Sequence, residues 1–202
     1  MNAEEAPLRG SAAEVLRVAT PLILASSSHA VRLFCDRVML AHHDHAEFSA
    51  SLSAGITAFT LSSLFMFTAG YASTFVAQYI GAGKPGRVGL AVWQGIYLAL
   101  LGGLLLASGA LWGRPFFAWT GSTGEALDHQ SAYFAVLSLG GVFPLLTQAI
   151  GSFWTGRGKT WTIAGLEWFA VALNLGANWV LIPGRLGFPA MGITGAGLGT
   201  VL

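Results

Sequence analysis

Three long stretches of the chain carry no acidic or basic side chain, and they dominate its pattern of hydrophobic and polar positions. They lie between Glu47 and Lys84, between Arg87 and Arg114, and between Asp128 and Arg157. Each is longer than the roughly 20 apolar residues that an α-helix needs to cross a bilayer. Inside hydrocarbon, backbone polar groups must bond within their own segment, as they do in an α-helix. The pattern therefore predicts an all-α integral membrane protein.

Clusters of glycine and proline divide the chain into helices, because these residues mark turns. We expect an N-terminal cytoplasmic segment at 1–17 and a transmembrane part at 18–202. The predicted helices cover about 18–41, 49–80, 88–112, 131–155, 161–182 and 191–202, the last of them incomplete. Arg114 and Pro115 are expected to end the third helix, and Pro144 to kink the fourth, because proline lacks an amide N–H.

The basic residues predict which end of each helix faces the cytoplasm. Cytoplasmic loops of membrane proteins carry an excess of lysine and arginine. With the N-terminus inside, the inner side carries Arg9, Arg17, Lys84, Arg87, Arg157 and Lys159, and the outer side carries Arg37, Arg114 and Arg185. We therefore expect a multi-pass protein of the inner (plasma) membrane with a cytoplasmic N-terminus.

The composition limits the classes of function that the chain can have. Hydrophobic residues make up 54% of the chain and charged residues 9%, and the net charge of +1 predicts no nucleic-acid partner. No set of nucleophile, histidine and acid is apparent, so we expect neither an enzyme nor a resident cofactor. Membrane lipids are the partners that the composition implies.

The few polar residues inside the predicted helices are the main candidates for function. Asp36 lies about 7–8 Å from the outer end of the first helix, at 1.5 Å per residue. Asn174 and Asn178 share one face of the fifth helix at a similar depth, and Thr200 of the sixth helix can approach them from below. Polar groups buried in a membrane face an interior or a wet cavity. These four residues are expected to converge around a cation or a proton.

Structural roles are the alternative for the same residues. Asp36 can pair with Arg32, one helical turn earlier. Asparagine side chains also bond across membrane helices and hold them together. Glu167 is expected to have a structural role or to extend to the inner interface. The glycine pairs Gly195/Gly199 and Gly109/Gly113 are expected at helix contacts, where small residues let backbones approach.

Two weaker motifs contain residue types that can bind ligands. Residues 80–85 resemble a phosphate loop, but Pro85 stands where Ser or Thr must bind magnesium, and no strand precedes it. Residues 42–47 contain three histidines and two acids, which can bind a metal but are more typical of a hydrated outer loop. We expect no metal site.

Three segments together resemble the multidrug and toxic compound extrusion (MATE) transporters. Pro21 and residues 34–39 are similar to the family's first-helix proline and Asp-x-x-Met segment. Residues 75–83 resemble its Val-Ala-Gln-x-x-Gly-Ala-Gly turn. Residues 173–200 look like its fifth helix, outer loop and the start of its sixth helix.

The resemblance implies half of a twelve-helix architecture, namely a six-helix bundle lobe whose sixth helix is truncated and which pairs with a C-terminal lobe. It implies an antiporter that exports amphipathic or cationic organic compounds in exchange for H⁺ or Na⁺. It also implies that Asp36, Asn174, Asn178 and Thr200 form the coupling site and that Pro21 lets the first helix bend. Some members have Asp where this chain has Asn178, so a pair of titrating carboxylates is excluded here.

Two other functions remain open from the sequence. A lipid-linked-sugar flippase of the same superfamily shares the helix layout, but it generally needs a more cationic cavity than Arg32 and Arg37 provide. A truncated membrane fragment that transports nothing is the other alternative, because the residues of a second lobe are absent from this sequence.

Overall fold

A computed structural model describes residues 12–201, without the side chains of residues 13, 14, 17 and 18. Most of the N-terminal segment predicted at 1–17 therefore lies outside the described residues. The described elements are α1 (Ala12–His43), α2 (His45–Gly70), α3 (Ala72–Gly81), the 3₁₀ turn η1 (Pro85–Arg87), α4 (Val88–Ala107), α5 (Gly109–Trp119), α6 (Gly124–Gly140), α7 (Val142–Gly156), α8 (Thr160–Leu181) and α9 (Gly192–Val201). The predicted all-α class is confirmed.

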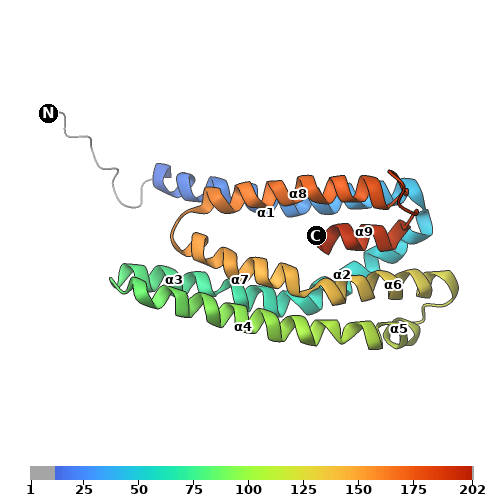
Figure 1. Cartoon of the computed structure of the whole chain (residues 1–202), viewed down its shortest axis with the longest axis horizontal. Helices are drawn as coiled ribbons and strands as arrows, with labels where there is room; N and C mark the ends of the chain where they lie inside the picture. The colour runs from blue at the N-terminus through green and yellow to red at the C-terminus, as the bar shows by residue number, and fades with distance from the viewer. Residues whose placement is uncertain (1–11, 202) are drawn as a thin grey trace.

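The helices form an elongated bundle (Figure 1). α1 and α8 run side by side along one flank, and α4 packs against α7 on the other. α2 packs against α6, while the short α9 contacts both α6 and α8. The expectation that the first, fifth and sixth predicted helices are neighbours is confirmed, because α9 also touches α1.

Three of the predicted helices are broken into two in the structure. The breaks fall at Tyr71 between α2 and α3, at Ser108 between α4 and α5, and at Gly141 between α6 and α7. Pro144 is the third residue of α7, and it cannot donate to the carbonyl of Gly140, four residues earlier. The helix therefore breaks just before the proline.

Two expected helix boundaries are wrong. Pro115 does not end the third helix, because α5 continues through it to Trp119. The following loop is shorter than predicted, since α6 begins at Gly124 rather than near residue 131. A proline late in a helix lacks only one intrahelical bond, and here the chain keeps its helical course despite that loss.

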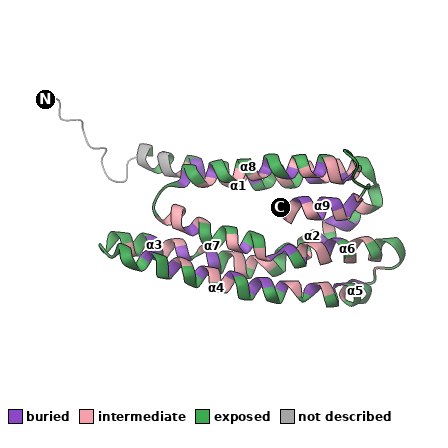
Figure 2. Cartoon of the chain, viewed as in Figure 1, coloured by how far each residue is buried: buried purple, intermediate pink, exposed green. Residues whose placement is uncertain are grey.

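Many large apolar side chains are exposed, and alanine is frequent among the buried residues. Buried and exposed positions alternate along the helices (Figure 2). Leu111 is 84% exposed, whereas Ala54, Ala69, Ala99 and Ala149 are each 0% exposed. This arrangement suits a lipid environment, in which close packing of small residues holds helices together. By length and composition, three stretches can cross a membrane: His45–Gly81, Pro85–Ala107 and Gly124–Gly156.

Both predicted glycine pairs lie at helix contacts. A Cβ atom added to Gly109 would stand 2.7 Å from Oγ of Ser138, and one added to Gly113 would stand 2.5 Å from Cδ1 of Phe134. A Cβ atom added to Gly195 would lie 2.9 Å from the backbone carbon of Leu181. Gly109 and Gly113 thus let α5 pack closely against α6, and Gly195 and Gly199 let α9 pack closely against α8.

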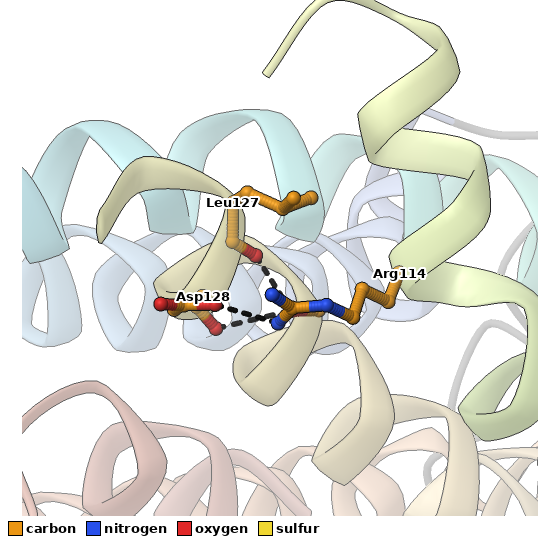
Figure 3. Close-up of polar contacts among 4 residues, drawn as sticks. Arg114, Leu127 and Asp128 are labelled. Carbon is orange, nitrogen blue, oxygen red and sulfur yellow. Dashed lines mark hydrogen bonds and ion pairs between the residues drawn. The ribbon is translucent and has the colours of Figure 1, made fainter. Parts of the chain in front are cut away.

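An exposed ion pair joins α5 to α6 at the end of the bundle. Arg114 Nη1 and Asp128 Oδ1 are 2.6 Å apart, beside Leu127 (Figure 3). Both charged side chains are 61% exposed. Water screens such a pair, so it contributes little to stability.

Candidate functional site

The structure brings together the four polar residues that the sequence singled out. Asp36 comes from α1, Asn174 and Asn178 from α8, and Thr200 from α9. Asn174 is 1% exposed, Asn178 0% and Asp36 6%. Asn174 and Asn178 are four residues apart, so the helix presents both on one face, toward α1 and α9.

Two hydrogen bonds hold the carboxylate of Asp36. The side-chain amide of Asn178 donates to its Oδ1 atom. The hydroxyl of Thr200 lies 3.2 Å from Oδ2 and 2.8 Å from the carbonyl of Ala196, to either of which it can donate. Arg32, the alternative partner in the sequence, donates instead to His29. The acid therefore belongs to an interhelical cluster and not to an i, i+4 ion pair.

Several buried polar atoms in this cluster lack a hydrogen-bond partner. Among the described residues, Asn174 Oδ1, Asn174 Nδ2 and Asn178 Oδ1 are buried and unpartnered. A buried polar group without a partner costs about 1–3 kcal/mol. The oxygens of these amides, together with the Asp36 carboxylate and the Thr200 hydroxyl, are the type of ligand that hard cations prefer.

Glycine makes room for the cluster. A Cβ atom added to Gly199 would overlap Oδ1 of Asn178 and would lie 3.6 Å from Nδ2 of Asn174. Because Gly199 has no side chain, α9 can approach α8 closely enough for Thr200 to contact Asp36.

One residue beside the site is not predicted by the sequence pattern. Tyr133 of α6 is 7% exposed and lies where α6 packs against α9, the helix that carries Thr200. Its ring also lies against Gly197 of α9. A Cβ atom added to Gly197 would stand 3.3 Å from Cδ2 of Tyr133. A lone tyrosine in an apolar helix looks like ordinary packing, so only the spatial arrangement reveals it.

The remaining candidates lie elsewhere. Pro21 is buried inside α1, which continues through it, so its role in bending stays a prediction. Glu167 of α8 lies near Ser28 of α1, 3.5 Å between Oε2 and Oγ. Asp44 caps α2 by accepting hydrogen bonds from the backbone N–H groups of Ala46 and Glu47. Within residues 12–201, no three His, Cys, Asp or Glu side chains are arranged to hold a metal ion.

The site can bind a small cation or a proton. Its one carboxylate carries either a negative charge or a proton, and the Asn178 amide and the Thr200 hydroxyl from two other helices contact it. The residues of the site come from three helices, α1, α8 and α9.

Comparison with known proteins gives a consistent family match. The family model MatE matches residues 21–180. The chain is 30% identical over 204 residues to a probable multidrug resistance protein NorM of Caulobacter vibrioides, covering 97% of this chain and 42% of that protein. It is 30% identical over 210 residues to the multidrug resistance protein PmpM of Pseudomonas aeruginosa, covering 99% and 43%.

Solved structures agree in fold. One, described as the outward-facing conformation of a multidrug resistance MATE family transporter of the MOP superfamily, has a TM-score of 0.83 at 18% identity. A MOP superfamily transporter from Pyrococcus furiosus has a TM-score of 0.79 at 18% identity. Each match covers 93% of this chain and 41% of the other. The chain thus spans about two fifths of the length of the proteins it matches.

Proposed function

The chain belongs to the MatE family, and from this premise we propose that it forms the N-terminal lobe of an antiporter that exports amphipathic or cationic organic compounds in exchange for H⁺ or Na⁺. The observation that carries the proposal is the buried Asp36 carboxylate, which Asn178 and Thr200 hold beside the unpartnered atoms of Asn174. Relatives of this chain are described as multidrug resistance proteins. The organic substrate then lies in a cavity that this lobe shares with a C-terminal lobe.

In the proposed cycle, the coupling ion is a substrate that Asp36 binds in one access state and releases in the other. Sodium binds through the carboxylate and the oxygens of Asn174, Asn178 and Thr200. A proton binds on the carboxylate itself, and the Thr200 hydroxyl then turns fully to the carbonyl of Ala196. Coupling requires that the ion favour one arrangement of α1, α8 and α9 over the other.

We also propose that this lobe lies in the inner (plasma) membrane with its N-terminus in the cytoplasm. The excess of basic residues at the loops 84–87 and 157–159 supports this orientation. In this orientation, the C-terminal end of α1 and the N-terminal end of α9 face outward.

Asp36→Asn tests the proposal, because it keeps the shape of the side chain and removes its charge. The full-length transporter is reconstituted in vesicles, and tetraphenylphosphonium export is measured under an imposed proton or sodium gradient. We expect gradient-driven export to be abolished while membrane insertion is retained. The matched control is Asp128→Asn, which removes an exposed carboxylate outside the site. Undiminished export by Asp36→Asn would show that this carboxylate has only a structural role.

A further inference from the structure

A second group of ionisable side chains lies between α1 and α8, away from the Asp36 cluster. Arg32 Nη2 donates to Nδ1 of His29 over 3.4 Å. Glu167 of α8 faces Ser28, the residue next to His29 on α1. The hydroxyl of Ser28, which is 0% exposed, reaches Oε2 of Glu167 at 3.5 Å. An acid, an imidazole and a guanidinium are thus gathered inside segments that otherwise contain few charges.

This group continues the polar faces that carry the candidate ion site. His29 and Asp36 are seven residues apart on α1, as are Glu167 and Asn174 on α8. Seven residues are about two helical turns, so each pair lies on one helix face, separated by roughly 10 Å. Arg32 is placed between His29 and Asp36, one turn from each.

Arg32 has two partners within reach. Its guanidinium now bonds to His29, which requires Nδ1 to be an unprotonated acceptor. Asp36 lies four residues later, one helical turn away on the same face of α1. The other elements around His29 bring one more charge, the Glu167 carboxylate of α8. α2 contributes the ring of Phe59, whose centroid is 6.2 Å from that of His29, and its one charged residue, Glu47, is in its first turn.

We propose that His29, which accepts a hydrogen bond from Arg32 and adjoins the Ser28 that contacts Glu167, is a second proton-binding site. We propose further that a proton on His29 transfers the Arg32 guanidinium to Asp36. A proton that binds Nδ1 fills the lone pair to which Arg32 donates, so the hydrogen bond breaks. The imidazolium then pairs with the Glu167 carboxylate. Arg32 is released toward the Asp36 carboxylate, which has lost its own proton.

The charges balance in each state. Before the step, Asp36 carries the proton, His29 is neutral, and Arg32 and Glu167 have opposite charges. Afterwards there are two ion pairs, Arg32 with Asp36 and His29 with Glu167. One proton leaves a carboxyl oxygen and one binds a ring nitrogen, by exchange with water, and no redox change occurs. The net charge of the four groups is therefore the same in both states.

The proposal rests on the proposed antiport function, and His29→Gln tests it. Glutamine can still accept the hydrogen bond from Arg32 but cannot take up a proton. In vesicles without sodium, we expect proton-driven export of tetraphenylphosphonium by the full-length variant to fall about tenfold, with a flattened dependence on pH between about 5 and 8. Binding of tetraphenylphosphonium at equilibrium should be unchanged. His42→Gln, the same substitution at an exposed position of α1, is the matched control.

Glu167→Gln provides a second variant. Without its carboxylate, the imidazolium forms only at higher proton concentration, so the pH profile of export should move by about one unit toward acid. An unchanged profile in both His29→Gln and Glu167→Gln, with export lost in Asp36→Asn, overturns the second site and leaves the antiport function standing. Export that is driven by sodium alone, and not by protons, also overturns the second proton-binding site at His29. Export retained in Asp36→Asn refutes the antiport function itself.

Discussion

Gly199 of α9 lies against the side-chain oxygen of Asn178 on α8, at a distance that leaves no space for a Cβ atom. The amide that this contact positions is the one that donates to Asp36. The smallest residue of α9 therefore helps to define the geometry of the ion site.

Gly199→Ala is expected to push α9 away from α8. Overpacking of this kind costs about 1–3 kcal/mol and should break the contact between Thr200 and Asp36. Thermal unfolding and export by the full-length transporter measure the effect, and Gly199→Leu should be worse than alanine. Gly176→Ala is the control, because an added Cβ there meets open space. Equal unfolding temperatures for the two alanine variants would contradict the packing role.

Thr200→Val removes one hydroxyl from the site at nearly constant volume. A neutral hydrogen bond contributes about 0.5–1.5 kcal/mol, so we expect ion binding to weaken about two- to tenfold. Titration of the full-length transporter with sodium or protons provides the measurement. Thr68→Val is the control, since that hydroxyl also bonds to the carbonyl four residues earlier but lies on an exposed part of α2. A similar small effect in both variants would exclude a specific role for Thr200.

Gly192→Ala should destabilise the outer end of the lobe. Gly192 has a φ angle of +51° and starts α9, and an added Cβ would lie 2.6 Å from Oε2 of Glu47. Glycine tolerates this backbone angle, whereas alanine there costs more than about 1 kcal/mol. The unfolding temperature of Gly192→Ala should therefore be lower than that of Gly165→Ala, because a Cβ atom added at Gly165 meets open space. The prediction fails if both variants unfold at the same temperature.

The N-terminus of α2 should be sensitive to acid. The backbone N–H groups of Glu47 and Ala46 hold the pKa of the Asp44 carboxyl below its usual value of 3.8. Because this pKa is lower in the folded state, the cap stabilises the helix above pH 3.8 and is lost as the pH falls through the folded value. Amide hydrogen exchange at residues 46–48, corrected for intrinsic pH dependence, should show this loss.

Asp44→Asn is the matched variant for that experiment, because asparagine caps helices about as well as aspartate but does not titrate. Its first turn should remain equally protected across the acidic range. The same acid-dependent loss of protection in both proteins would assign the effect to another group, such as Glu47.

Much of the candidate site could be predicted because its members break the apolar pattern. Asp36, Asn174 and Asn178 are polar residues inside hydrophobic segments, and helix geometry alone gives their depth and shared face. Tyr133 could not be found this way, because an aromatic residue in a membrane helix has many ordinary reasons to be there. Its contact with the site depends on how α6 packs against α9, which no local pattern encodes.

Some helix boundaries could also be predicted from local sequence, whereas others depend on tertiary packing. Glycine and proline located most turns, but the breaks at Tyr71 and Ser108 were not predicted, although Gly70 and Gly109 adjoin them. Pro115 failed as a stop signal, because the packing of α5 on α6 through Gly109 and Gly113 keeps the helix continuous. Tertiary contacts therefore decide where local preferences are overridden.

The close packing of α9 against α8 opposes sliding of one helix along the other. With Gly195 against the backbone of Leu181 and Gly199 against Asn178, a shift of α9 by one residue along α8 would press Thr194 or Ala196, and Leu198 or Thr200, into spaces that hold no side chain. Sliding of α9 along α8 is therefore sterically opposed, and we expect these two helices to move together when the geometry at Asp36 changes.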